Sequence, residues 1–175
     1  MRIPVASSTS YRGRNERPNL LLLAAFVIIA LGAGVITYLL GPATSPEAAH
    51  WYGSLIKPAW MPPSRWFAPL WATLYGLMAL GAWLIFRERY HRARGIALFA
   101  YWLQLLLNAA WAPVFFVTRS IGAGLFVTLA LLFAVAWTVR EFGRVRASAA
   151  LLMLPYFAWL CVVVAMNYEI WALNP

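Results

Sequence analysis

The sequence contains five apolar runs, each long enough to cross a lipid bilayer as a helix. A helix that rises roughly 1.5 Å per residue needs about 20 apolar residues to cross ~30 Å of hydrocarbon. Runs of this length occupy positions 20–40, 66–86, 96–117, 121–139 and 147–170. The last three connections are short, and short connections make neighbouring helices antiparallel. The sequence therefore predicts an all-α membrane protein, with a bundle of five transmembrane helices over residues 20–175 and a long first loop.

Composition and charge agree with this arrangement. Hydrophobic residues make up 63% of the chain and the mean hydropathy is +0.72, whereas soluble domains are about 45–50% apolar. Of the 14 basic residues, eleven lie in the amino-terminal segment and in the second and fourth loops, which share one side of a five-helix bundle. Basic loops are retained in the cytoplasm during insertion. We therefore predict a multi-pass protein with a cytoplasmic amino terminus and a carboxyl terminus on the opposite side.

The residues before the first run have a different character. Positions 1–19 are polar and rich in Ser and Arg, and we expect a disordered basic tail. An arginine-rich start followed by an apolar run also resembles a secretory signal peptide. The first run has 21 residues, however, and the apolar region of a signal peptide has about 7 to 15. We expect this run to remain as the first transmembrane helix.

The first loop, residues 41–65, is unlike a simple linker. It contains five prolines together with Trp51, Tyr52 and Trp60. Long loops that carry their own aromatic residues are usually functional elements. Ser45 followed by Pro46 is typical of the start of a helix, with Ser as the N-cap and Pro in the first position. The loop is therefore predicted to form a short helix, over residues 47–56, that covers the mouth of the bundle.

Several kinds of chemistry lack the residues they need. Two His, one Cys and no Asp cannot supply a metal site, a carboxylate pair or a Ser–His–Asp triad. There is no glycine-rich phosphate loop, and the basic residues follow the membrane pattern instead of forming a nucleic-acid surface. No run has an ionisable residue near its middle, as proton-coupled pumps do. The sequence thus predicts no metal, no cofactor and no nucleic-acid partner, and it disfavours energy-coupled transport.

Neutral polar and aromatic side chains lie inside the runs. Gln104, Asn108 and Trp111 share one face of the third predicted helix. An amide without a hydrogen-bond partner in hydrocarbon costs ~2 to 7 kcal/mol, so both amides are expected to point into the bundle. Trp71 and Trp159 lie deeper in their runs than interfacial tryptophans do. Two interpretations stay open: these groups hold the helices together, or they line a cavity.

A set of motif residues follows in order along the first loop and four of the runs. The positions are Trp51-Tyr52, Leu55, Lys57-Pro58, Trp60, Pro62-Pro63, Pro69, Trp71, Leu74-Tyr75, Met78, Leu107-Asn108, Trp111, Pro113, Phe115-Phe116, Trp137-Thr138, Pro155-Tyr156, Trp159 and Asn167. This ordered set resembles the translocator protein family, the TspO or peripheral benzodiazepine receptor type. The resemblance covers the chain from Trp51 to about residue 174.

The resemblance implies an integral membrane receptor or regulator, often a homodimer. Members bind porphyrins such as protoporphyrin IX, sterols in animals, and synthetic benzodiazepine-type ligands. A porphyrin would then be a ligand and not a resident cofactor, and no residue is expected to be catalytic or to bind a metal. The positions that match the family's ligand pocket, with the neighbouring Trp111 added, are Tyr52, Trp71, Asn108, Trp111 and Trp159. The candidate cations for porphyrin propionates at the mouth are Lys57 and Arg65.

Three functions remain open at this point. The first is a tetrapyrrole-binding receptor that takes part in porphyrin transport or homeostasis. The second is a porphyrin-degrading membrane enzyme with Trp71 and Trp159 as redox-active indoles, although no cofactor motif supports it. The third is a sterol or lipid transporter. The sterol-recognition pattern of animal members is absent, since no basic residue follows Tyr168.

Overall fold

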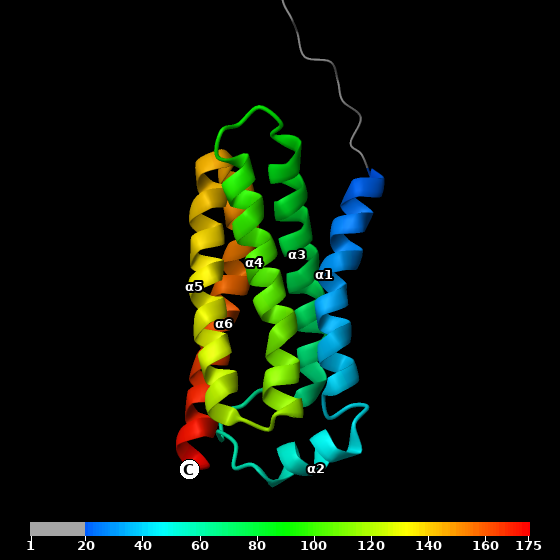
Figure 1. Cartoon of the computed structure of the whole chain (residues 1–175), viewed down its shortest axis with the longest axis vertical. Helices are drawn as coiled ribbons and strands as arrows, with labels where there is room; N and C mark the ends of the chain where they lie inside the picture. Colours follow the sequence, from blue (N-terminus) through cyan, green and yellow to red (C-terminus); the bar gives the residue numbers. More distant parts are fainter. Residues whose placement is uncertain (1–19) are drawn as a thin grey trace, which may run out of the picture.

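Within residues 20–175, which the computed structural model describes, the chain forms five long helices (Figure 1). Residues 1–19, with the predicted disordered tail, lie outside the described residues. The helices are α1 (Leu20–Leu40), α3 (Phe67–Arg87), α4 (Arg94–Ala112), α5 (Ile121–Val145) and α6 (Ala147–Leu173). A 3-10 turn (Ser64–Trp66) precedes α3, and a π-helical turn (Pro113–Val117) extends α4. All five segments are long and apolar enough to cross a membrane, which confirms the prediction of an all-α membrane bundle.

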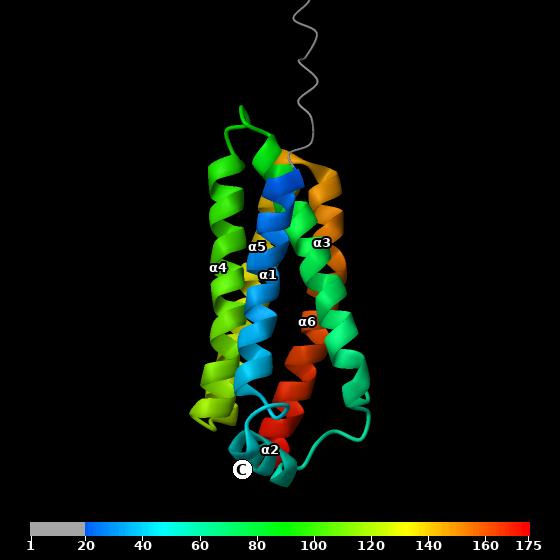
Figure 2. The same cartoon turned by 90° about the vertical axis from the view of Figure 1, so that its right-hand side faces the viewer.

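The five helices pack as a closed ring around one core. α1 lies against α3 and α4, α5 lies between α4 and α6, and α6 returns to contact α3 (Figures 1 and 2). Met78, Tyr101 and Tyr156 are fully buried inside the ring. Large apolar side chains such as Phe126 and Phe133 are exposed on its outside, as expected of a surface that faces lipid tails. The ring therefore has an apolar exterior and an interior where the polar groups meet.

α5 is longer than its apolar run. The sequence places a polar connection over residues 140–146, but the helix continues to Val145. Glu141 is only 1% exposed, and its carboxylate pairs with Arg140 at 2.8 Å and Arg144 at 2.9 Å. The next residue, Phe142, is fully buried. Because the ion pairs satisfy the buried carboxylate and Phe142 packs into the core, the last turns stay helical and α6 begins after a single residue.

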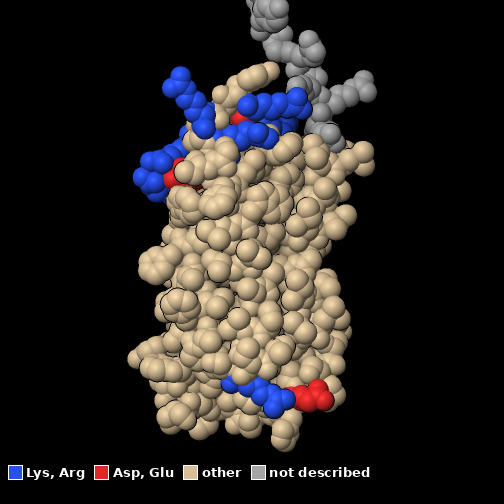
Figure 3. All heavy atoms as spheres, viewed as in Figure 1, with Lys and Arg blue, Asp and Glu red and all other residues tan. Residues whose placement is uncertain are grey.

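The basic side chains of the described residues gather at one end of the ring. Seven arginines lie in or next to the α3–α4 and α5–α6 connections, and the opposite end has only Lys57, Arg65 and Arg119. Figure 3 shows this cluster at one end, with a nearly uncharged band over most of the face in view. Such a band is the surface that hydrocarbon requires. The two ends are named below the basic end and the low-charge end.

The first loop crosses the low-charge end and carries the predicted short helix, α2 (Pro46–Ser54). Ser45 is its N-cap and accepts a hydrogen bond from the backbone N–H of Ala48 at 3.2 Å. Figures 1 and 2 both place α2 beneath the ends of the long helices. The structure thus confirms a helix within the first loop, and we refer to residues 41–63 as the lid.

Candidate functional site

Asn108 joins three helices in the middle of the ring. Its side-chain oxygen accepts a hydrogen bond from the hydroxyl of Tyr75 on α3 at 2.7 Å, and its side-chain N–H group donates to the hydroxyl of Tyr156 on α6 at 2.7 Å. All three side chains are buried. Buried polar groups in lipid must find partners inside the protein. The α4 amide therefore points into the bundle, as expected, and it fixes the positions of two phenol rings.

Trp71 completes what we call the inner cluster, which consists of Trp71, Tyr75, Asn108 and Tyr156. The Trp71 ring lies 5.6 Å from that of Tyr75 and 6.0 Å, edge to face, from that of Tyr156. On α1, Gly34 allows this packing, because a Cβ atom there would lie 2.8 Å from the Tyr75 ring. The inner cluster is therefore an aromatic surface with a single amide at its centre.

Trp159 lies next to the inner cluster on α6, one helical turn beyond Tyr156. Its ring packs edge to face on Phe67 at the start of α3, with 5.9 Å between centroids. The indole nitrogen of Trp159 is inaccessible to solvent and has no hydrogen-bond partner among the described residues. Trp159 therefore extends the aromatic surface toward the low-charge end and leaves one N–H donor unused.

A second group of rings, the lid cluster, joins the lid to the end of α4. It consists of Trp51, Tyr52, Trp111, Phe115 and Phe116. Trp111 stacks on Phe115 at 4.8 Å, and Tyr52 meets Phe116 edge to face at 5.9 Å. The two phenylalanines lie in the π-helical turn that extends α4, and such turns often occur at functional sites. The lid is therefore attached to the bundle through aromatic contacts.

The expected ligand-binding residues thus divide between the two clusters. Trp71 and Asn108 belong to the inner cluster, Tyr52 and Trp111 belong to the lid cluster, and Trp159 lies beside the inner cluster. The indole nitrogen of Trp111, like that of Trp159, is buried without a partner in the described part of the chain. A buried donor without an acceptor costs about 1 to 3 kcal/mol. Among the buried polar atoms without a partner in the described residues, these two donors are the ones on expected ligand-binding residues, and a ligand with acceptor atoms could satisfy them.

Of the two candidate cations for porphyrin propionates, Lys57 contacts the lid and Arg65 lies on the surface. Lys57 Nζ lies 4.6 Å from the centre of the Tyr52 ring and donates a hydrogen bond to the carbonyl of Leu55 at 3.1 Å. Arg65 is exposed beside Trp66. Burial raises the pKa of the Tyr52 phenol above its usual value, so this hydroxyl stays protonated at neutral pH. In this arrangement Lys57 stabilises the lid through a cation–π contact.

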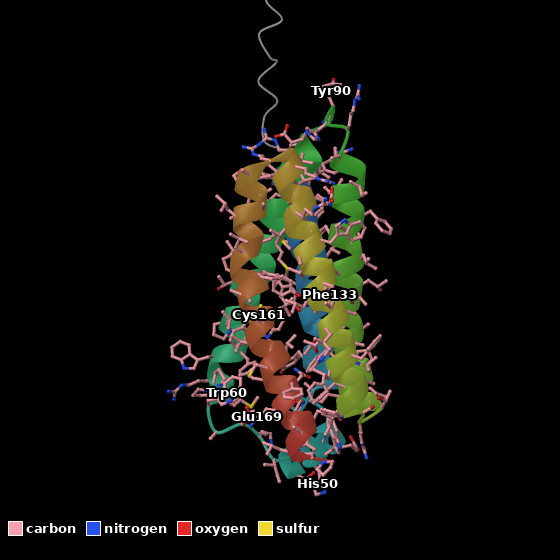
Figure 4. All side chains as sticks on the ribbon, turned by 90° about the vertical axis from the view of Figure 1, so that its left-hand side faces the viewer. His50, Trp60, Tyr90, Phe133, Cys161 and Glu169 are labelled. Atoms are coloured by element: carbon pink, nitrogen blue, oxygen red, sulfur yellow. The ribbon has the colours of Figure 1, made fainter. Side chains whose placement is uncertain are left out.

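Hydrogen bonds to α6 hold the far end of the lid. The side chain of Asn174 accepts from the backbone N–H of Ile56 and donates to its carbonyl, both at 2.9 Å. The indole N–H of Trp60 donates to the Glu169 carboxylate at 2.6 Å, and Figure 4 shows these two side chains next to each other. We call these contacts the clasp.

The sequence left several of these residues without a role. Tyr75 and Tyr156 are among the motif positions, yet nothing local shows that their hydroxyls meet Asn108. Tyr156 is 48 positions from its partner, and Asn174 is 118 positions from Ile56. Pairings at such separations depend on how the helices pack and leave no signal in spacing.

The fold and the site together define an integral, multi-pass membrane protein whose aromatic interior is covered by a lid. The TspO/MBR family model matches residues 23–172. The chain therefore belongs to the TspO/MBR family.

Known relatives cover most of the chain. The translocator protein of Bos taurus is 39% identical over 133 residues, which are 75% of this chain and 79% of that protein. Protein CrtK of Rhodobacter capsulatus is 33% identical over 158 residues, 90% of this chain and 95% of that protein. Tryptophan-rich protein TspO of Chlorobaculum tepidum is 32% identical over 160 residues, 89% and 98% of the two chains. The predicted resemblance is confirmed, and membership supports a role as a membrane receptor or transporter.

Proposed function

We propose that the protein is a membrane receptor for porphyrins and similar flat hydrophobic ligands, with a role in tetrapyrrole transport or homeostasis. The observation that carries this proposal is the aromatic interior beneath the lid, where the buried indole N–H groups of Trp111 and Trp159 have no partner within residues 20–175. A porphyrin offers a broad apolar face for stacking on aromatic rings. Its propionates offer the acceptors that the indole donors lack.

Binding requires the rings to separate. In the inner cluster, Trp71 lies within 6.0 Å of both neighbouring phenols, so a macrocycle between these rings must displace at least one of them. The lid cluster and the clasp close the low-charge end above the inner cluster. We therefore propose that the ligand binds under the lid, between the two clusters, after the lid has moved. Lids that close over ligands commonly behave in this way.

Titration with protoporphyrin IX tests this function. We expect the purified protein to bind it saturably, and we expect Trp159→Phe and Trp111→Phe each to weaken the affinity about tenfold, because each keeps an aromatic ring but removes a charge-assisted donor. The shift of the porphyrin absorption band is the suitable measurement, since tryptophan emission changes in the variants themselves.

Trp137→Phe is the matched control, because Trp137 packs on the exposed ring of Phe99, outside both clusters. Its affinity is expected to equal that of the unchanged protein. Equal affinities for all three variants, or no saturable binding at all, would remove the assignment of porphyrin to this interior.

We also propose that the basic end lies in the cytoplasm, because basic loops resist translocation. The clasp residue Asn174 then lies on the opposite side. We expect alkaline phosphatase fused after the carboxyl terminus through a flexible linker to be active in a bacterial host, and a fluorescent protein at the same position to be dark. A bright fluorescent fusion with an inactive phosphatase would reverse this orientation.

A further inference from the structure

A pocket lies outside the aromatic interior, between α2 and the connection from α4 to α5. Its volume is about 480 Å³ and it is open to the surroundings. The residues that line it are Pro46, Glu47, His50, Trp51, Ser54 and Arg119. Figure 4 shows His50 at the outermost part of the low-charge end. None of these side chains belongs to the inner cluster, and the pocket needs its own explanation.

The pocket carries one fixed charge of each sign. Glu47 is exposed on the first turn of α2. Its own backbone N–H and the Ser45 hydroxyl hold the pKa of this carboxyl below its usual range, with a smaller contribution from Arg119. His50 lies one helical turn further along, on the same face of α2 as Glu47. A ligand with separate positive and negative groups would complement this arrangement.

The backbone at Arg119 supports a functional reading of that residue. Its φ angle is 52°, the only positive value for a non-glycine residue in the described part of the chain. Arginine adopts this region at some cost in energy, and such strain is concentrated at functional sites. Arg119 lines the pocket and its charge acts on the Glu47 carboxylate, and guanidinium groups bind phosphate through two parallel hydrogen bonds.

The surroundings of the pocket are apolar. Trp51 forms one wall, with its ring edge to face on Phe115 at 5.2 Å. Beyond Arg119 on either side along the chain, Val117 is 62% exposed and Phe126 is 73% exposed. Arg119 itself lies between the ends of two segments long and apolar enough to span a membrane, and residues at the ends of such segments face the lipid headgroups. A molecule bound here can therefore place a polar head in the pocket and apolar chains on the outside of α4 and α5.

We propose that this pocket binds the headgroup of a zwitterionic aminophospholipid, with the phosphate on Arg119 and His50 and the primary ammonium on Glu47. The indole of Trp51 packs against the carbon atoms between the two charged groups. An anionic lipid without an amine would leave the Glu47 carboxylate unpaired beside its headgroup, which is unfavourable. A free phosphoamine has the same headgroup chemistry but cannot use the exposed apolar residues beside the pocket. The zwitterionic lipid pairs both charged groups that line the site, Glu47 and Arg119.

Native mass spectrometry of the full-length protein tests the proposal, with dioleoyl phosphatidylethanolamine and dioleoyl phosphatidylglycerol in equal amounts. We expect the unchanged protein to retain the ethanolamine lipid about tenfold better, since charge-assisted hydrogen bonds to its ammonium distinguish the two. Arg119→Gln should lose most retention of both lipids. Glu47→Gln should remove the preference for the amine, so that the glycerol lipid is retained equally or better.

Arg65→Gln is the matched control, because Arg65 is an exposed cation at the same end of the molecule and does not line the pocket. Its lipid preference should equal that of the unchanged protein. A preference for the ethanolamine lipid that persists in Glu47→Gln would overturn the assignment, as would unchanged retention in Arg119→Gln. Displacement of the lipid by free phosphoethanolamine at the same concentration would also overturn it, in favour of a soluble ligand. Glu47, Arg65 and Arg119 are all exposed, so the three variants should unfold at the same temperature as the unchanged protein.

Discussion

Replacing Asn108 with leucine is expected to lower the free energy of unfolding by about 2 to 4 kcal/mol, because the change leaves two buried phenol hydroxyls without a partner. Asn108 is the group through which Tyr75 on α3 and Tyr156 on α6 are joined to α4, with both hydrogen bonds at 2.7 Å. The leucine is close to asparagine in size, so the loss reports hydrogen bonding more than packing. Reversible unfolding in mixed detergent micelles, followed by circular dichroism, gives this quantity.

A triple variant separates the hydrogen bonds from other effects of the substitution. Adding Tyr75→Phe and Tyr156→Phe to Asn108→Leu removes both stranded hydroxyls, and replacing all partners by apolar groups is often nearly neutral. We expect the triple variant to recover most of the lost stability. A triple variant that is less stable than Asn108→Leu alone would show that the amide bridge is not the source of the loss.

The same triple variant also separates stability from binding. It keeps the aromatic rings of the inner cluster but removes the central amide and both hydroxyls, so Tyr75, Asn108 and Tyr156 no longer offer a ligand a hydrogen-bonding group. A fold that is restored without restored porphyrin affinity would place the polar groups of the inner cluster, the Asn108 amide with its two hydroxyl partners, in the ligand site itself. The comparison therefore distinguishes a residue that only holds helices together from one that also contacts a ligand, the two interpretations that the sequence leaves open.

The parts of the fold that the sequence predicts are those set by local rules. Run length and spacing identify the five membrane helices, since hydrocarbon thickness fixes how many apolar residues a helix needs. The pair Ser45-Pro46 identifies the start of α2, since capping depends on adjacent residues only. Glu141 shows the limit of this reasoning. Charge suggested a loop, but two arginines on the same helix neutralise the carboxylate, and the helix continues.

The candidate site is predictable only in part. Helical spacing places Asn108 inside the bundle because an unpaired amide in lipid is costly, and the amide is indeed buried. Its partners come from helices that meet α4 only after the ring has closed. The motif positions likewise do not separate Trp111, which packs with the lid, from Trp71, which packs at the centre. Which residues share a cluster depends on the order of helices around the ring, and hydropathy carries no information on that order.

Breaking the clasp is expected to release the lid and to raise the rate of ligand dissociation about tenfold, because neutral hydrogen bonds contribute roughly 1 kcal/mol each and those to a charged group more. The double variant Asn174→Ala, Glu169→Gln removes both backbone contacts to Ile56 and weakens the bond from Trp60. Stopped-flow displacement of bound protoporphyrin IX measures the rate. Hydrogen exchange at the Tyr52 amide, which lies in α2 within the lid cluster and is bonded to neither substituted residue, reports opening of the lid without any ligand.

Glu47→Gln is the matched control for the loss of charge, since it removes an exposed carboxylate from the same end of the protein but not from the clasp. If the lid limits ligand release, both readouts should rise together in the double variant and stay unchanged in the control. Faster exchange at Tyr52 with an unchanged dissociation rate would mean that the ligand leaves by a route that avoids the lid, for example between two helices of the ring. That result would place ligand exit at a helix interface instead of the lid. The interface of α1 would then be the first candidate, since α1 has the smallest buried share of the five membrane segments.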